Sequence, residues 1–278
     1  MDPRDKGITR TSRHYRKFAR RATLIAILAI LLPILWFSGN YTYQVIRTDM
    51  ESDVLASEED LIESFYLVAH TSDLLEPTYR FPVHKWGLDV SVYYHPSLTD
   101  WHRRITERQL QILSKYSGIN FRTTDRFDQN VGLSVFYAPF GMTAGEMAKN
   151  LGIDYDRIRL ATCYAIHEWG DDGTNQWGHV VYSRPPEERH TETCIVEETI
   201  QVLGLPADRA TYFPTVFTND RVRSVALSIN DKILLRALYD PAIKTGMSQE
   251  QTRTLIPGII RRLVTGVKAR GEQALYQN

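Results

Sequence analysis

One short segment brings together two carboxylates and a carboxamide that could serve in catalysis or in cation binding. Glu197 and Glu198 are adjacent, and Gln201 follows at the three- and four-residue steps that place side chains on one face of a helix. Carboxylates can act as general bases, and carboxylate oxygens bind hard cations. A purely structural alternative stays open, in which these residues form a polar helix face satisfied by hydrogen bonds. The other face is apolar and consists of Val196, Thr199, Ile200 and Leu203.

This segment resembles the zinc-binding helix of metzincin peptidases, whose pattern is H-E-x-x-H-x-x-G-x-x-H. When the two are aligned on Gly204, Glu198 occupies the general-base position. The first, second and third histidine positions are occupied by Glu197, Gln201 and Ala207. Asp208 follows directly after the third position. The resemblance therefore implies a zincin or metzincin-like domain whose ligands have been replaced.

A second stretch supports the resemblance. Residues 228–239 are similar to the C-terminal helix of matrixin-type domains, which begins at a Ser or Asp cap and ends in Leu-Tyr. The chain is also similar to a membrane-anchored bacterial metzincin-like family of unknown function, which carries C-x-x-E-E-x-x-Q-x-L-G-L and L-Y-D-P. These motifs stand here at residues 194–205 and 238–241. The similarity covers residues 57–260.

The substitutions remove the usual zinc ligands. A catalytic zinc needs three protein ligands, commonly including imidazoles, but the carboxamide of Gln201 is a poor ligand and Ala207 cannot ligate. Two carboxylates and one amide are also too few for calcium without further oxygens. We therefore expect no metal and no cofactor. On this interpretation Glu197, Gln201 and Asp208 line a binding cleft, and Glu198 is catalytic only if the domain still hydrolyses a substrate.

Other chemistries fit this segment less well. Adjacent Glu197 and Glu198 diverge by about 100° around a helix, which argues against the facing carboxylates of a glycosidase. No trio of neighbouring histidines replaces the missing ligands, although His190 is close enough in sequence to act as a lone ligand. We expect surface or hydrogen-bonded positions for His167, His179 and His190.

Cys163 and Cys194 are the two cysteines of the chain. Exported proteins lie in oxidising compartments, so an exported domain would favour a disulfide between them. Such a bond would close a loop of about 30 residues and stabilise the fold by roughly 3–4 kcal/mol. It would also fix the helix that carries Glu197 and Glu198. Two unpaired buried thiols are the alternative, and metal ligation by two isolated cysteines is disfavoured.

A membrane anchor is predicted near the N-terminus. Residues 22–43 carry no charged side chain and are long enough to cross a bilayer as a helix. Residues 1–21 carry eight basic and two acidic side chains, which by the positive-inside rule places this segment in the cytoplasm. A cleaved signal peptide is the alternative, but the long basic segment and the lack of a clean Ala-x-Ala site argue against it. Topology and anionic lipid explain the basic residues better than nucleic-acid binding does.

The rest of the chain has the opposite charge balance. Of 33 basic and 33 acidic residues in total, 25 basic and 31 acidic residues follow residue 21. This acidity gives no reason to expect nucleic-acid binding. We expect a single-pass protein of a bacterial inner membrane that contacts lipid through residues 22–43. A linker at residues 44–56 would then lead to an exported, periplasmic domain at residues 57–278.

Hydrophobic periodicity predicts an α+β domain, with a mixed sheet of about five strands packed with helices. Helix caps are predicted at Ser57, at Asp100, at Thr193 for a helix over residues 194–203, at Ser228 or Asn230, and at Ser248. The predicted strands span residues 86–94, 119–123, 131–137, 160–167 and 178–182, and a short helix is predicted near residues 144–151. Pro257 either kinks the last helix or marks its start.

Three functional hypotheses follow. The first is a non-catalytic component of the cell envelope that binds a peptide or an envelope protein. In metzincins an edge strand pairs with an extended peptide, and the strand near residues 160–165 would do so here. The second is an atypical peptidase or hydrolase that uses Glu198 as general base. The third is a structural spacer in an envelope complex.

Overall fold

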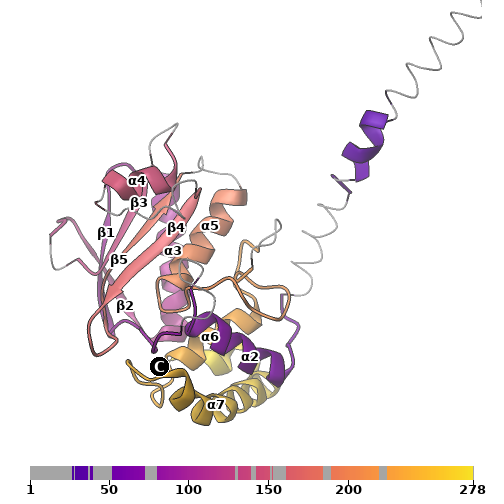
Figure 1. Ribbon diagram of the computed structural model, residues 1–278, viewed down its shortest axis with the longest axis vertical. Coiled ribbons are helices and arrows are strands. Elements are labelled where there is room, and N and C mark those ends of the chain that lie inside the picture. Colours follow the sequence, from indigo (N-terminus) through magenta and orange to yellow (C-terminus); the bar gives the residue numbers. More distant parts are fainter. Residues whose placement is uncertain are drawn as a thin grey trace, which may run out of the picture. The chain divides into compact units, whose positions relative to one another are not determined.

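The fold comes from a computed structural model (Figure 1), which describes residues 27, 29–36, 38–39, 52–72, 80–128, 131–138, 142–150, 152, 161–183, 189–218 and 224–277. The chain divides into two compact units, Met1–Arg47 and Thr48–Asn278. In the first unit residues 29–36 are helical. Across the described residues, no helix combines the length and the apolar character needed to cross a membrane. The predicted anchor at residues 22–43 lies partly, and the basic segment at 1–21 wholly, outside the described residues.

The second unit is built on a five-stranded mixed sheet, as predicted. Its order is β2 (Asn120–Thr124), β1 (Asp89–Tyr94), β3 (Leu133–Tyr137), β5 (Asn175–Tyr182) and β4 (Cys163–Trp169). The first four strands run parallel, and β4 pairs antiparallel with β5 at one edge. The two faces of the sheet are both covered, as expected for a largely parallel sheet.

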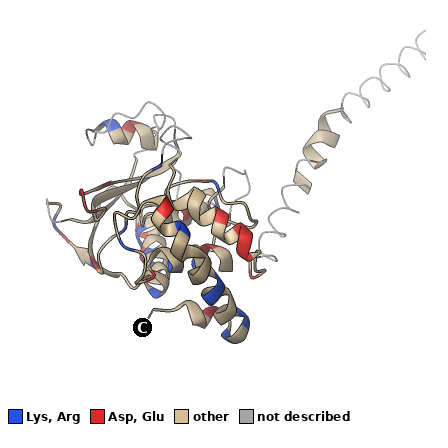
Figure 2. Ribbon diagram, turned by 60° about the horizontal axis from the view of Figure 1, so that its bottom comes forward, with Lys and Arg blue, Asp and Glu red and all other residues tan. Residues whose placement is uncertain are grey.

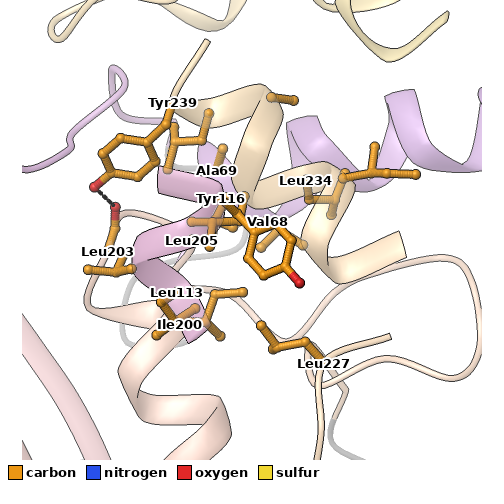
Figure 3. Close-up of a cluster of buried hydrophobic side chains, with 14 of the residues drawn as sticks. Val68, Ala69, Leu113, Tyr116, Ile200, Leu203, Leu205, Leu227, Leu234 and Tyr239 are labelled. Carbon is orange, nitrogen blue, oxygen red and sulfur yellow. Dashed lines mark hydrogen bonds between the residues drawn. The ribbon is translucent and has the colours of Figure 1, made fainter. Parts of the chain in front are cut away.

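The larger hydrophobic core lies on one face of the sheet and involves most of the helices. It joins the sheet to α2 (Glu58–Ala69), α3 (Asp100–Ser117), α5 (Arg189–Gln201), α6 (Ile229–Leu238) and α7 (Gln249–Arg270), followed by the short η1 (Glu272–Leu275). A smaller core on the other face is covered by α4 (Ala144–Asn150). Figure 3 shows part of the larger core, in which Leu113 of α3 lies next to Ile200 of α5.

Helix starts were largely predictable because capping is a local interaction. The side chains of Ser57, Ser228 and Ser248 each accept a hydrogen bond from the backbone three residues on. The predicted cap at Asp100 is wrong by one residue, since the hydroxyl of Thr99 accepts from the His102 N–H. Pro257 lies inside α7 and does not mark its start.

The predicted start of α5 is also wrong. The helix begins at Arg189, four residues before the predicted cap at Thr193. The Thr193 hydroxyl donates to the carbonyl oxygen of His190 at 2.8 Å, so it bonds backward within the helix. Threonine can make either interaction, and its position alone does not choose between them.

Candidate functional site

A disulfide joins the edge strand to the helix that carries the candidate residues. Cys163 at the start of β4 is bonded to Cys194 in α5, with their Cα atoms 6.0 Å apart. The predicted pairing is therefore confirmed, and the described chain has no free cysteine. The bond fixes α5 against β4, so Glu197 and Glu198 are held one helical turn beyond a covalent tether.

The turn after α5 is fixed by a glycine. Gly204 has φ +111°, and a Cβ built there would lie 2.1 Å from the carbonyl oxygen of His84. Only glycine can take this backbone geometry this close to another chain segment. The neighbouring carbonyl groups are also held, because the Trp86 indole donates to Val202 at 2.8 Å and the Tyr239 hydroxyl to Leu203 at 2.9 Å. Figure 3 shows the second of these bonds.

Glu197 and Glu198 are buried, with 2% and 5% of their surface exposed. One carboxylate oxygen of each and the Sγ atom of Cys163 all lie within 4.8 Å of one another. The Cα–Cβ bonds of these adjacent residues point in different directions around the helix, as expected. The carboxylate oxygens nevertheless come near one another, because long side chains can bend toward one point. Residues 193–200 of α5 are all buried, so neither glutamate lies on a solvent-facing side of the helix.

The electrostatic effect of Glu198 reaches two tyrosines. Burial, and after it the negative charge of Glu198, raises the pKa of the Tyr164 phenol above its ordinary value. For Tyr182 burial again comes first, with Glu198 adding to the rise in pKa. Both hydroxyls are therefore protonated and uncharged at neutral pH. Tyr182 belongs to the larger core on the α5 face of the sheet, whereas Tyr164 belongs to the smaller core on the other face.

Gln201 and Asp208, predicted to share a cleft, do lie together. The Gln201 side-chain amide donates to a carboxylate oxygen of Asp208 at 2.6 Å. This bond joins the last residue of α5 to the loop beyond Gly204. Ala207, at the third histidine position of the resembled motif, is fully buried. The pair therefore holds the turn together while keeping a carboxylate and an amide next to each other.

Sequence reasoning missed a histidine beside this turn. His84 is fully buried, and its ring stacks on Trp169 with centroids 3.7 Å apart and lies 5.6 Å from the ring of His167. Neither nitrogen of His84, nor Nε2 of His167, has a hydrogen-bond partner in the described structure. His167 was expected to lie at the surface or to be hydrogen-bonded, but its Nε2 atom is buried and has no hydrogen-bond partner among the described residues. No local pattern could have revealed a contact between residues so far apart in sequence.

Burial keeps these two imidazoles neutral. It lowers the pKa of His84 to about 3 and that of His167 to about 4. A positive charge on the nearby His167 ring would oppose protonation of His84, which lowers the pKa of His84 further. His190, by contrast, is exposed as predicted.

The segment that carries these residues matches a known protein family. A family model described as a protein of unknown function (DUF2927) matches residues 58–258. The chain belongs to this family. The DUF2927 match starts with α2 and ends inside α7, so it includes the whole sheet, the disulfide and every candidate site residue. No curated protein matches the chain.

Proposed function

We propose that the DUF2927 domain binds an extended polypeptide segment as an added strand along β4, without hydrolysing it. On this proposal residues 22–43 anchor the chain in a bacterial inner membrane, and the domain binds a peptide or envelope protein in the periplasm. The observation that carries the proposal is the position of β4, an antiparallel strand at the edge of the sheet. Exposed sheet edges commonly bind extended peptides.

The backbone groups available for such binding follow from the hydrogen bonds of β5. The Gly178 N–H donates to Gly132 and the Tyr182 carbonyl accepts from Ala138, so both groups point toward β3. Their partners in the antiparallel register are His167 and Cys163. In an antiparallel pair, two opposed residues either both point their N–H and C=O groups toward each other or both point them away from each other. The outward-facing residues of β4 are therefore Cys163, Ala165 and His167.

The side chains of the same three residues lie on the α5 face of the sheet. Cys163 and Ala165 pack against the larger core, and the Sγ atom of Cys163 lies within 4.8 Å of one carboxylate oxygen each of Glu197 and Glu198. Trp169, at the end of β4, is 37% exposed. A strand added here would run beside these groups. Buried carboxylates and an exposed indole could then select a bound side chain.

Two features support binding without catalysis. The metzincin resemblance provides a glycine turn at Gly204 and a general-base position at Glu198, but no imidazole at any ligand position. Without a metal, a water molecule near Glu198 keeps a high pKa, and peptide hydrolysis loses its main driving element. Strand addition needs only the backbone groups of β4, which the substitutions leave in place.

A proline at the edge tests the proposal. Short random peptides displayed on phage would be selected for binding to the full-length chain. The affinity of the recovered peptides would then be measured. Ala165→Pro removes an outward-facing N–H without removing a bond to β5 and should abolish binding. Ala165→Val keeps the N–H and should bind within about threefold of wild type. Peptides that bind Ala165→Pro as tightly as wild type would rule out strand addition at β4.

A second function is favoured by one observation. Glu197 and Glu198 are both buried, and one carboxylate oxygen of each lies within 4.8 Å of one of the other. An atypical hydrolase with Glu198 as general base would use this pair. In that case Glu198→Gln should lower hydrolysis of a peptide library by at least about a hundredfold. Equal rates for wild type and Glu198→Gln, with bound metal measured in both, would remove Glu198 from any mechanism.

A further inference from the structure

The disulfide and the two glutamates bring four potential metal ligands to one place. Cys163 Sγ and one oxygen each from Glu197 and Glu198 lie within 4.8 Å of one another, and Cys194 Sγ is bonded directly to Cys163 Sγ. Within the described ranges this is the one group of three or more histidine, cysteine, aspartate or glutamate side chains with donor atoms so close. It combines sulfur with oxygen, which distinguishes it from an ordinary group of acidic side chains.

The placement of the four side chains follows from the fold. Cys194, Glu197 and Glu198 are spaced by three and four residues, so they lie on one face of α5. Cys163 approaches that face from β4. Cys194, Glu197 and Glu198 are all buried, whereas Cys163 is partly exposed. Cys163 is therefore the more exposed end of the disulfide.

The state of the disulfide decides what this cluster can bind. A disulfide sulfur carries no thiolate, and the thiolate is the metal ligand. Once reduced, the cluster offers two thiolates and two carboxylates, which matches the four-coordinate ligand sets of zinc. With zinc–sulfur bonds of about 2.3 Å and zinc–oxygen bonds of about 2 Å, tetrahedral ligands stand roughly 3–4 Å apart. Calcium would instead require six or more oxygens.

We propose that reduction of the Cys163–Cys194 disulfide turns this cluster into a zinc site with Cys163, Cys194, Glu197 and Glu198 as ligands. A dithiol reductant supplies two electrons and two protons, and its own sulfurs become a disulfide. The two cysteine thiols then each release a proton to water as they bind Zn²⁺. The metal replaces the covalent link between β4 and α5. This site does not depend on the peptide binding proposed above.

Cobalt provides a spectroscopic test on the full-length chain. The protein would be reduced with a phosphine, freed of reductant and titrated with Co²⁺ and then Zn²⁺. We expect stoichiometric cobalt binding with thiolate-to-cobalt charge-transfer absorption in the near ultraviolet, which zinc abolishes by displacement. The oxidised chain and a Cys163→Ser/Cys194→Ser variant should show no such absorption.

Matched variants identify the carboxylate ligands. Glu197→Gln and Glu198→Gln should each weaken zinc binding by at least about tenfold. Glu192→Gln is the control, since Glu192 lies on the same helix but forms an ion pair with Arg108; it should bind zinc like the wild type. If both Glu197→Gln and Glu198→Gln bind zinc like the wild type, the proposed ligand set is wrong.

Circular dichroism recorded at each step shows whether reduction unfolds the chain. If it does, zinc should restore the native spectrum, because metal binding at a structural site is coupled to folding. Three results would overturn the proposal: a folded, reduced chain that binds no stoichiometric cobalt, a bound cobalt without thiolate absorption, or an unfolded, reduced chain that zinc does not refold.

Discussion

The buried imidazole of His84 makes the protein sensitive to acid. Both nitrogens lie in an aromatic environment formed by Phe81 and Trp169, where a charged ring has no hydrogen-bond acceptor among the described residues. Burial lowers the pKa of His84 to about 3 from 6.5. As pH falls below about 6.5 the unfolded chain therefore takes up a proton that the folded chain does not. Folding stability from this residue is present above that pH and is lost on acidification.

A substitution at His84 checks this sign. His84→Phe keeps an aromatic ring of similar size but removes the titrating group, so the loss of stability between pH 7 and pH 4 should become smaller. At pH 7 the unfolding free energy should change by less than about 1.5 kcal/mol. Urea denaturation at several pH values measures both quantities.

The control is His190→Ala, which alters an exposed histidine and should leave the wild-type pH dependence in place. A His84→Phe variant that loses as much stability on acidification as wild type would show that the His84 ring is not the source. His167, whose pKa burial lowers to about 4, contributes in the same direction and should remain visible in that variant.

At the scale of elements, the turn after α5 is the most sharply determined feature. Gly204→Ala would place a Cβ 2.1 Å from the His84 carbonyl oxygen at a backbone φ of +111°. Backbone strain and displacement of His84 together should lower the unfolding free energy by about 3 kcal/mol or more. Thermal unfolding followed by circular dichroism measures the loss.

Gly258 in α7 provides a matched control for the same substitution. A Cβ there would meet no atom within 4 Å, so Gly258→Ala should stabilise the helix by roughly 0.5–1 kcal/mol. Equal effects at the two positions would mean that Gly204 is not held against His84.

The contacts that the sequence could predict are those between residues close together in the chain. The caps at Ser57, Ser228 and Ser248 are contacts across three residues, so local patterns identify them. The disulfide was predictable because two cysteines have one way to pair. The meeting of Glu197 and Glu198 at Cys163, and of His84 with His167, depends on how distant segments pack. No local pattern contains that information.

At the scale of the whole molecule, the net charge of zero combines two unlike parts. Residues 1–21 are strongly basic, whereas the remainder is acidic on balance. Figure 2 shows acidic and basic residues interspersed along the helices of the second unit. The charge asymmetry therefore lies between residues 1–21 and the rest of the chain. The positive-inside rule relates such an asymmetry to the orientation of a protein in a membrane.

A topology experiment tests this proposal. With alkaline phosphatase fused after Asn278, the enzyme should be active and membrane-associated in bacteria, because it folds only after export. A fusion to green fluorescent protein should stay dark, since that protein does not fold when exported unfolded. A fluorescent fusion with an inactive phosphatase counterpart would place the domain in the cytoplasm and contradict the anchored orientation.

Hydrogen exchange can show whether β4 receives an added strand. Amide exchange would be followed residue by residue in the full-length chain, with and without a peptide recovered from the phage selection. The amides of Cys163, Ala165 and His167 should exchange at least about tenfold more slowly in the complex, because they gain hydrogen bonds to the peptide. Their neighbours Tyr164 and Ile166, which already face β5, should change little. Protection elsewhere in the domain with no change at those three amides would contradict strand addition at β4.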